Sequence, residues 1–389
     1  MFTRIWKAFA VAKILFIAYS FQKGGAARSA NRIADEVAQE HEVVMLATRF
    51  KEARGTKIKR ILGVLLLLIE RFFLIFLPRQ YPGEKLNIDL LSHLSQHDVE
   101  KENCDIIFLH WHQNCALSLK QIRKIKKPIW FYCHDEWLLS GVAHYQIEGG
   151  SFIRRYLEQR FSTRFAQTLK DVNCEIVYTP SNYLAEKISK CYGVKSQVWR
   201  PKIKKDIFCY RPSTTEFKKV RLLFGVADSA MAHVKGLDTI AETILLLDQQ
   251  KIDLDISCFG GTPPRSLRNR CNYLGYIRND YLLAEKMAQH DIFLCPSRYE
   301  AFGQVAAEAL MCGCYLIGSK GTGLEDIISK PEFGTLINPG HAEELALAIV
   351  DAARDATLFD KETKILRADL AAMLFYKHNR TPVKLLRQI

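Results

Sequence analysis

The most informative segment of this sequence runs from Asp291 to Gly313 and changes its pattern twice. Residues 291–295 form a short apolar run typical of a buried parallel strand, and Pro296 ends that strand because proline has no N–H to donate. After Gly303 the residues are good helix formers as far as Gly313, a residue that suits a helix end. The segment therefore predicts a strand, a loop and a helix in succession.

The start of this helix is a candidate ligand site. Its first N–H groups have no partner within the helix, its dipole is positive there, and open α/β sheets bind ligands at this edge. Glu300 lies in the loop and Glu308 in the second turn of the helix. The two carboxylates can bind hydroxyls on either side of a diphosphate, which is the shape of a nucleotide sugar. In the alternative interpretation, Glu300 only favours the helix dipole and Glu308 is a solvated helix residue.

The motif over 296–308, Pro-Ser-x-x-Glu-x-Phe-Gly-x-x-x-x-Glu, resembles the nucleotide-sugar signature of the retaining glycosyltransferases of family 4. The resemblance covers essentially the whole chain, strongly over 220–340 and weakly over 50–100. It implies an α/β chain with the GT-B fold, in which two Rossmann-like domains face each other with a cleft between them. Residues 137–145 look like a branch of exopolysaccharide and colanic-acid-type transferases.

The resemblance also implies roles for the residues of this motif. It implies that Glu300 binds hydroxyls of the donor sugar and that Glu308 binds the ribose hydroxyls. The diphosphate is then expected to accept hydrogen bonds from the backbone N–H groups of Phe302, Gly303 and Gln304.

A pair of glycines, Gly24 and Gly25, lies between a first strand predicted over 13–19 and a first helix predicted to run to about Gln39. Glycine permits close approach of a ligand to the backbone, although many such turns carry glycine for steric reasons alone. The full Gly-x-Gly-x-x-Gly of a dinucleotide binder is absent, which argues against a dehydrogenase. The pair is similar to the glycine loop of the family-4 enzymes, which faces the donor phosphates.

His134 follows a strand predicted within 128–137 and so falls at the ligand side of a sheet. The family-4 transferases place a histidine at the end of such a strand, where it meets the donor sugar and the reaction centre. His134 and Asp135 resemble that site, and the resemblance implies the same contact for His134.

Lys235 stands with Gly236 where a loop leads into a helix, and a lysine there can reach phosphates. The pair matches the family, in which the lysine stabilises the departing diphosphate. One position departs from the family pattern, because Ala230 stands where an arginine is usual. His233 or another basic side chain is a candidate replacement.

With 389 residues the chain is expected to form two domains of ordinary size. We predict an N-terminal Rossmann-like domain over 1–200 on the acceptor side and a nucleotide-sugar-binding domain over 220–389. The basic, proline-broken segment 201–219 is the predicted linker. The GT-B architecture also allows the last helix, predicted from about Lys361, to pack back on the N-terminal domain.

The balance of 55 Lys and Arg against 42 Asp and Glu gives a formal charge of +13, so an anionic partner is expected. Nucleic acid, anionic lipid and a phosphorylated substrate all satisfy that condition. Basic residues are scattered along the chain and no nucleic-acid-binding fingerprint accompanies them. We therefore favour a membrane surface and expect no nucleic acid.

Eleven cysteines lie mostly in apolar runs and are expected to be small core residues of a reducing compartment, without disulfides or structural zinc. Four histidines are candidate metal ligands, because His-x-His on a strand points both rings to one face. These are His110, His112, His134 and His144. GT-B enzymes as a family need no metal, and we expect neither a metal nor another cofactor.

Residues 61–77 are almost entirely apolar, and their length approaches that of a membrane span. Glu70 and Arg71 in their middle disfavour a span, since each charge costs about 2.5–3.5 kcal/mol on insertion scales. The basic segment 51–60 precedes them. Two interpretations stay open: a surface helix that dips into an anionic leaflet, or a buried helix of the N-terminal domain.

These observations predict a metal-independent retaining glycosyltransferase of the hexosyltransferase type, with a UDP- or GDP-linked sugar as donor. The expected acceptor is a saccharide or lipid-linked saccharide in the synthesis of cell-surface polysaccharide or lipopolysaccharide. Its expected catalytic residues are His134, Lys235 and Glu300. No cleavage site follows the N-terminal apolar run, which predicts a cytoplasmic protein, peripheral on the inner face of the membrane. The alternatives are a non-catalytic GT-B-like binding or scaffold subunit and, third, a basic nucleic-acid binder.

Overall fold

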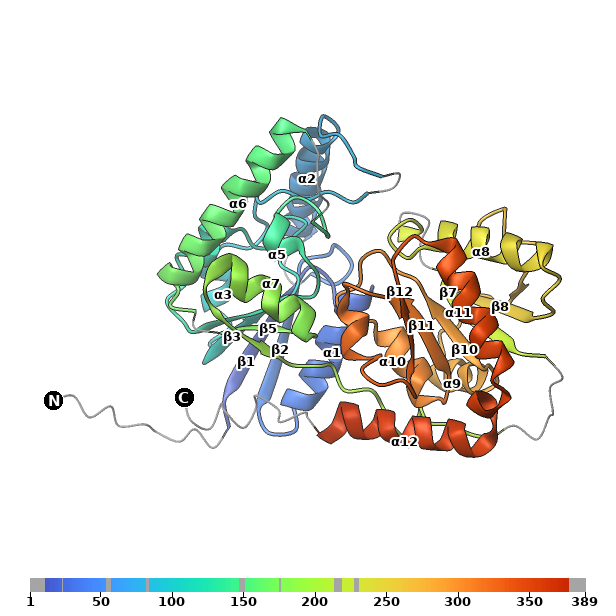
Figure 1. Cartoon of the computed structure of the whole chain (residues 1–389). Helices are drawn as coiled ribbons and strands as arrows, with labels where there is room; N and C mark the ends of the chain where they lie inside the picture. The colour runs from blue at the N-terminus through green and yellow to red at the C-terminus, as the bar shows by residue number, and fades with distance from the viewer. Residues whose placement is uncertain are drawn as a thin grey trace. The chain divides into compact units, whose positions relative to one another are not determined.

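The computed structural model describes residues 11–22, 24–53, 57–81, 84–146, 151–174, 176–212, 219–226 and 231–377. They divide into two compact units (Figure 1), the first holding most of the described residues up to Lys202 and the second most of those from Ile203 onward. Ile203, Ile207 and Phe208 lie buried in the hydrophobic core of the second unit. This part of the predicted linker is therefore packed, and the predicted domain limits stay a prediction.

The first unit contains a sheet of six parallel strands. In order across the sheet these are β2 (Glu42–Ala47), β1 (Lys13–Ala18), β3 (Ile106–Leu109), β4 (Ile129–Tyr132), β5 (Ile176–Thr179) and β6 (Lys195–Val198). Buried aromatic side chains, among them Phe16, Phe108 and Tyr178, fill one side of it. The strand expected within 128–137 forms as β4, but it is shorter than predicted and ends before His134, just as β3 ends before His110.

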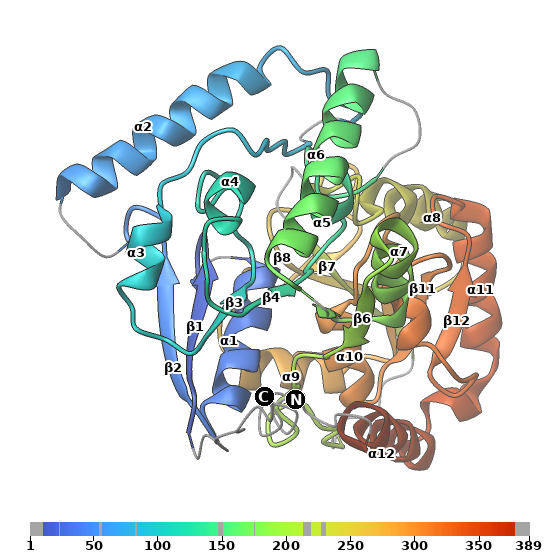
Figure 2. The same ribbon diagram turned by 90° about the vertical axis from the view of Figure 1, so that its left-hand side faces the viewer.

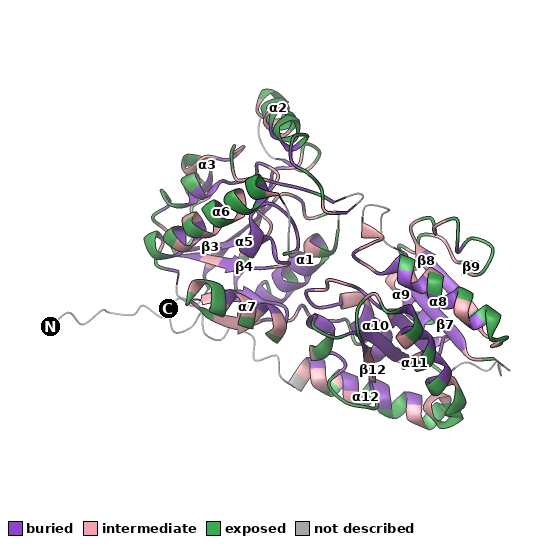
Figure 3. Cartoon of the chain, turned by 45° about the horizontal axis from the view of Figure 1, so that its top comes forward, coloured by how far each residue is buried: buried purple, intermediate pink, exposed green. Residues whose placement is uncertain are grey.

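Seven helices occur among the described residues of the first unit: α1 (Gly25–Val37), α2 (Lys57–Leu74), α3 (Gln96–Glu100), α4 (Leu119–Ile122), α5 (Trp137–Ser140), α6 (Phe152–Asp171) and α7 (Asn182–Tyr192). Helix α2 differs from the rest, since only Glu70 and Leu74 within it are buried and it is mostly green in Figure 3. The interpretation of 61–77 as a buried helix is therefore wrong. No helix in the described ranges is both long and apolar enough to cross a bilayer.

The second unit repeats the architecture with another sheet of six parallel strands. Across the sheet these are β12 (Gly334–Ile337), β11 (Tyr315–Ser319), β10 (Ile292–Cys295), β7 (Arg221–Val226), β8 (Asp255–Gly260) and β9 (Asn272–Tyr273). Its helices are α8 (Leu237–Gln249), α9 (Asp280–Ala288), α10 (Gln304–Met311), α11 (Ala342–Arg354) and α12 (Lys361–Lys377), with 3₁₀ turns η2 (Gly323–Asp326) and η3 (Ala356–Phe359). The predicted α/β fold with two Rossmann-like domains is confirmed.

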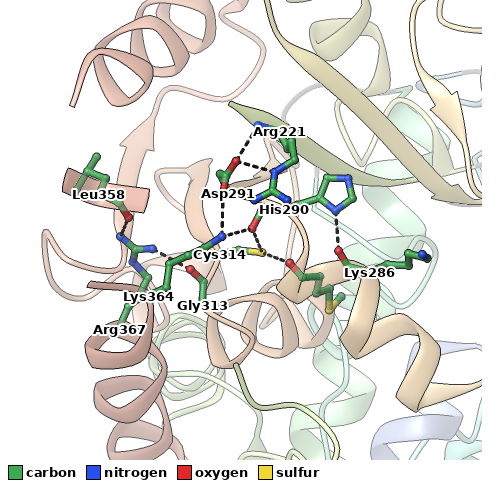
Figure 4. A network of polar contacts seen from close by, with 10 residues as sticks. Arg221, Lys286, His290, Asp291, Gly313, Cys314, Leu358, Lys364 and Arg367 are labelled. Carbon is green, nitrogen blue, oxygen red and sulfur yellow. Dashed lines mark hydrogen bonds and ion pairs between the residues drawn. The ribbon is translucent and has the colours of Figure 1, made fainter. Parts of the chain in front are cut away.

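Helix α12 belongs to this second unit, where Ala371 and Phe375 enter the core. A buried polar network fixes it at the amino edge of the sheet (Figure 4). The Asp291 carboxylate accepts hydrogen bonds from the Arg221 guanidinium at 2.8 and 3.0 Å and from the Lys364 ammonium at 2.8 Å. Because these charges are nearly fully buried, their mutual pairing is what makes the arrangement tolerable.

The order of the strands locates the ligand edge of the second sheet. Strand β7 is flanked by β8 on one side and by β10 on the other, so the chain changes direction across the sheet between β7 and β10. Such a switch point is where open α/β sheets bind ligands, outside the carboxyl ends of the strands. The loops that follow these two strands carry Lys235 and Glu300.

Candidate functional site

The loop after β10 leads into α10 as the sequence predicts. Strand β10 ends at Cys295 and α10 begins at Gln304, with Gly303 at the N-cap in a left-handed conformation (φ 93°). A Cβ atom at Gly303 would lie 2.7 Å from the Leu324 side chain, so glycine is required for both conformation and space. The resulting helix N-terminus lies at the carboxyl edge, where its N–H groups can bind an anion.

Glu308 is fully buried in α10. The interpretation of Glu308 as a solvated helix residue is therefore wrong. A carboxylate is expensive to bury and is retained where it hydrogen-bonds a defined partner. Its burial is consistent with the ribose-binding role that the sequence motif implies.

Lys235 and Glu300 meet at the switch point. The Lys235 ammonium donates to a carboxylate oxygen of Glu300 at 2.5 Å, although the residues lie 65 positions apart. Gly236 fixes this approach, because it is left-handed (φ 67°) and a Cβ there would lie 2.1 Å from the carbonyl oxygen of Pro296. The side chains of Lys235 and Glu300 remain 27% and 18% exposed, so a ligand can reach both.

A third loop, after β11, completes this part of the site. The N–H of Gly323 donates to the carbonyl oxygen of Glu300 at 2.7 Å. A Cβ at Gly323 would lie 2.2 Å from the carbonyl oxygen of Ala301, so only glycine fits against this loop. Loops from three neighbouring strands thus hold Glu300 in place.

Arg298 is a residue of the site that the sequence did not single out. Its guanidinium donates to the carbonyl oxygen of His233 at 2.9 Å and to the Asp238 carboxylate at 2.6 Å. The backbone N–H of Arg298 donates to the carbonyl oxygen of Val234 at 2.8 Å. Arg298 therefore ties the loop that carries Lys235 to the loop that carries Glu300. The sequence signal that could have identified Arg298 is its position two residues before Glu300.

The position of the family's arginine, Ala230, lies outside the described residues. His233, the candidate replacement, places a ring nitrogen 3.5 Å from the Asp238 carboxylate. His233 lies two residues before Lys235 in the same loop, and its role toward a phosphate stays a prediction.

In the first unit, His134 follows β4 and pairs with His110, which follows β3. Their ring nitrogens, Nε2 of His134 and Nδ1 of His110, lie 3.0 Å apart. Burial lowers the pKa of His134 to about 4 and the pKa of His110 well below its ordinary value. Both rings are therefore neutral near pH 7 and act as hydrogen-bonding groups. With Trp111, Asp135 and other neighbours they line a small pocket.

The other histidines of the predicted metal set have separate partners. His112 contacts the carbonyl oxygen of Leu117 at 2.9 Å, and His144 pairs with the Asp135 carboxylate at 2.7 Å. Because β3 ends at Leu109, the His-x-His pair lies beyond the strand, and the alternation of side chains along a strand does not apply to it. Among the residues that the structure describes, no group of three or more His, Cys, Asp and Glu side chains could hold a metal ion.

Gly24 and Gly25 form the turn between β1 and α1. Gly24 is the N-cap of α1 with φ 97°, a conformation that favours glycine. A Cβ atom at either position would meet nothing within 4 Å. Packing within the unit therefore does not explain Gly25, and the space beside it is available to a ligand at the helix N-terminus.

Comparison with known proteins agrees with this geometry. Residues 221–355 match the family described as glycosyl transferases group 1, and residues 23–201 match glycosyltransferase family 4. The chain carries two glycosyltransferase domains. The family 4 match begins after β1 and contains β2 to β6, whereas the group 1 match contains β7 to β12, so each match holds one of the two groups of residues described above.

The chain is 24% identical over 242 residues to an uncharacterized 41.2 kDa protein in the cps region of Klebsiella pneumoniae. This match covers 60% of the chain and 65% of the length of that relative. The matches to two other curated relatives each cover 25% of the length of the relative. Two solved structures share the GT-B fold with the glycosyltransferase domains. Sucrose-phosphate synthase from Thermosynechococcus elongatus has a TM-score of 0.66 and 16% identity, covering 97% of this chain and 96% of its own. Anabaena HepE in complex with UDP and glucose has a TM-score of 0.61 and 15% identity, covering 97% of both chains.

Proposed function

We propose that the protein is a retaining glycosyltransferase that moves a sugar from a UDP- or GDP-linked donor to a saccharide or lipid-linked saccharide acceptor. The observation that carries this proposal is the Lys235–Glu300 pair at the switch point of the second sheet, beside the N-terminus of α10. A cation, a carboxylate and a helix N-terminus together suit a sugar diphosphate. The HepE structure in complex with UDP and glucose supports the choice of ligand class.

Each residue has a distinct part in the proposed reaction. The N–H groups at the start of α10 and the Lys235 ammonium bind the diphosphate, and Lys235 stabilises the negative charge that develops on it. Glu300 accepts hydrogen bonds from hydroxyls of the donor sugar, and Glu308 accepts them from the ribose. Neutral His134 hydrogen-bonds to the sugar near its reacting carbon, and Gly24 and Gly25 leave room for the phosphates.

The bond between the anomeric carbon and the diphosphate oxygen breaks, and a bond between that carbon and an acceptor oxygen forms on the same face. The proton of the acceptor hydroxyl passes to the departing phosphate oxygen. This step needs no metal, because Lys235 and the helix N-terminus compensate the leaving-group charge. The products are a nucleoside diphosphate and the glycosylated acceptor.

The proposed setting is the synthesis of cell-surface polysaccharide or lipopolysaccharide at the cytoplasmic face of the membrane. The resemblance of residues 137–145 to exopolysaccharide and colanic-acid-type transferases supports a polysaccharide product. The net charge of +13 supports a location at an anionic surface, where a lipid-linked acceptor is held.

A donor panel tests the proposal. The purified full-length protein is titrated with UDP- and GDP-linked sugars, and donor binding and slow donor hydrolysis are both measured. We expect one donor to bind and to be hydrolysed, with both activities reduced about 10- to 100-fold in Glu300→Gln, because a hydrogen bond to a charged group is lost. The exposed Glu343→Gln on α11 is the matched control and should match the wild type.

His134→Ala separates catalysis from binding. It should reduce hydrolysis while leaving nucleoside diphosphate binding unchanged, since His134 is assigned to the sugar. Absence of binding by every donor at millimolar concentration would refute the proposal. Donor binding without hydrolysis or transfer would instead identify a non-catalytic binding subunit.

A further inference from the structure

We infer that the outer side of α2, together with the first turn of α6, is the surface by which this protein docks on an anionic lipid bilayer. The α2 surface is defined by six exposed apolar side chains: Leu65, Leu68, Phe72, Phe76, Phe152 and Ile153. This inference rests on the proposed function, which places the protein at an anionic membrane, and it names the part of the protein that makes the contact.

The α2 surface concentrates exposed apolar side chains to an unusual degree. Of the 26 large hydrophobic side chains that are exposed in the described part of the chain, eleven lie between 58 and 76. Leu68 is 59% exposed and Phe76 is 70% exposed. Single exposed apolar residues are ordinary, whereas a contiguous group of this kind marks an interaction site.

Helix α2 is attached to the first unit by one narrow side. A Cβ at Gly63 would lie 2.3 Å from the His93 ring, so the helix backbone packs directly on that histidine. Further along, the Glu70 carboxylate accepts hydrogen bonds from the Ile88 N–H at 3.1 Å and from the Cys115 thiol at 2.8 Å. These contacts fix the rotation of the helix, and the α2 surface faces outward as a result.

Both charges in the middle of the apolar run bond to the first unit, although Arg71 stays exposed. Glu70 is fully buried toward the unit. The guanidinium of Arg71 donates to the side-chain oxygen of Asn114 at 3.0 Å and to the carbonyl oxygen of Leu86 at 3.4 Å. These charges count against a helix that crosses a bilayer, but they do not count against one that lies flat on it.

Helix α6 extends the surface beyond the end of α2. Leu157 of α6 packs against the buried cluster that contains Leu74 and Leu77, so the two helix ends are neighbours. In Figures 1 and 2, α2 ends and α6 begins at the top of the first unit. Phe152 is 76% exposed and Ile153 is 58% exposed in the first turn of α6. Two separate segments of the chain therefore contribute to one apolar surface.

The charge around α2 matches anionic headgroups. Residues 51–80 contain seven basic and two acidic residues, and both acidic side chains are turned inward. Glu52 accepts hydrogen bonds from the Ser20 hydroxyl at 2.6 Å and from the Phe21 N–H at 2.7 Å. Glu70 is held in the same way by its bonds from Ile88 and Cys115. Lys51, Lys57 and Arg79 are exposed. Basic residues beside an apolar helix side are the pattern of interfacial membrane binding.

The same charges disfavour a second copy of the chain as the occupant. Two copies joined through the α2 surface would bring together two basic segments, and like charges across an interface oppose association. A bilayer supplies opposite charge at its surface and apolar chains beneath it. It therefore satisfies both properties of the surface.

Vesicle sedimentation with the full-length protein tests the inference. Vesicles contain either phosphatidylcholine alone or one part phosphatidylglycerol to two parts phosphatidylcholine. We expect binding to the anionic vesicles that weakens as salt rises. The variant Leu68→Gln, Phe72→Gln, Phe76→Gln should bind more than about tenfold less, because three apolar side chains no longer enter the bilayer. The matched control carries Leu245→Gln, Leu282→Gln and Leu347→Gln on exposed positions of the second unit and should bind normally.

A second measurement covers the case in which the triple variant fails to fold. The chain has five tryptophans of its own, so the measure is quenching beyond that of the wild type. Brominated lipids should quench more fluorescence in Phe76→Trp than in the wild type, whereas Leu347→Trp should show no such increase. No added quenching in Phe76→Trp, equal binding by both triple variants, or a dimer that the α2 variant dissociates would each overturn the inference. The vesicle assay needs no donor, so Glu300→Gln should bind vesicles normally even where donor hydrolysis fails. That comparison separates a failure of this inference from a failure of the proposed function.

Discussion

The two edges of the second sheet hold their charges in opposite ways. At the amino edge, the side chains of Asp291 and Lys364 are 7% and 3% exposed and bond to each other, to Arg221 and to the backbone. At the carboxyl edge, Lys235 and Glu300 pair with each other but remain several times more exposed. Both edges belong to the same six strands.

This difference separates charges that hold the unit together from charges that a ligand can reach. The Asp291 network joins β7, β10 and α12, three elements that are distant in sequence. A buried network of this kind resists change, because removal of one member leaves the others uncompensated. The Lys235–Glu300 pair costs less to open, since water or the hydroxyls and phosphates of a ligand can replace each partner.

Asp291→Asn should give the largest effect on stability. The change leaves the buried Arg221 and Lys364 charges without their carboxylate, and we expect the second unit to lose about 3–5 kcal/mol of unfolding free energy. Urea denaturation measures this loss. The exposed pair of Asp253 with Lys219 is the matched control, and Asp253→Asn should cost less than about 1 kcal/mol. Equal losses in the two variants would remove the contrast between the edges.

The pH dependence of the same variant sharpens this test. Burial alone would raise the pKa of Asp291, but hydrogen bonds from Arg221 and the charge of Lys364 outweigh burial and hold the pKa below its ordinary value. A lowered pKa contributes stability above the ordinary value of about 3.9 and loses it as the pH falls toward the folded-state pKa. The difference in unfolding free energy between the wild type and Asp291→Asn should therefore be largest near pH 7 and shrink below about pH 4.

Lys235→Ala should reduce activity strongly and stability little, which is the reverse of Asp291→Asn. Sugar transfer or donor hydrolysis should fall about 10²- to 10³-fold, the usual effect of removing a group that stabilises developing charge. The melting temperature should change little, because the side chain is partly exposed. Lys330→Ala, an exposed lysine of the same unit, should leave hydrolysis unchanged. A large loss of stability in Lys235→Ala would place Lys235 with the structural charges.

Arg298→Ala should give the smallest of these effects. Arg298 holds the loop of Lys235 through His233 and Asp238, so we expect about a tenfold loss of hydrolysis from poorer positioning. Arg298→Lys keeps a donor at this place and should restore part of the activity. If Arg298→Ala matches Lys235→Ala instead, then Arg298 acts directly on the ligand.

Local pattern predicted much of the fold. The run of apolar residues before Pro296 and the helix formers after Gly303 give β10 and α10 with accurate limits. Local pattern does not predict strands β6, β9 and β12, since they are short, mostly not buried and without a continuous apolar run. Their pairing with neighbouring strands decides their conformation.

Contacts between distant residues were not predictable in the same way. Asp291 and Lys364 are 73 positions apart, and no spacing rule connects them. The pairing of His110 with His134 also depends on which strands become neighbours. For α2, the sequence showed an apolar run with two charges, and only the structure shows that Glu70 is buried toward the unit and that Arg71, although exposed, bonds to Asn114.

The contact of Gly236 with Pro296 has a consequence for engineering. A Cβ atom at position 236 would lie 2.1 Å from the Pro296 carbonyl oxygen, so the loops after β7 and β10 fit together at fixed separation. Neither loop can be replaced alone by its counterpart from a related enzyme without disturbing that fit. Chimeras built to change the donor should therefore exchange segments 231–240 and 296–304 as a pair.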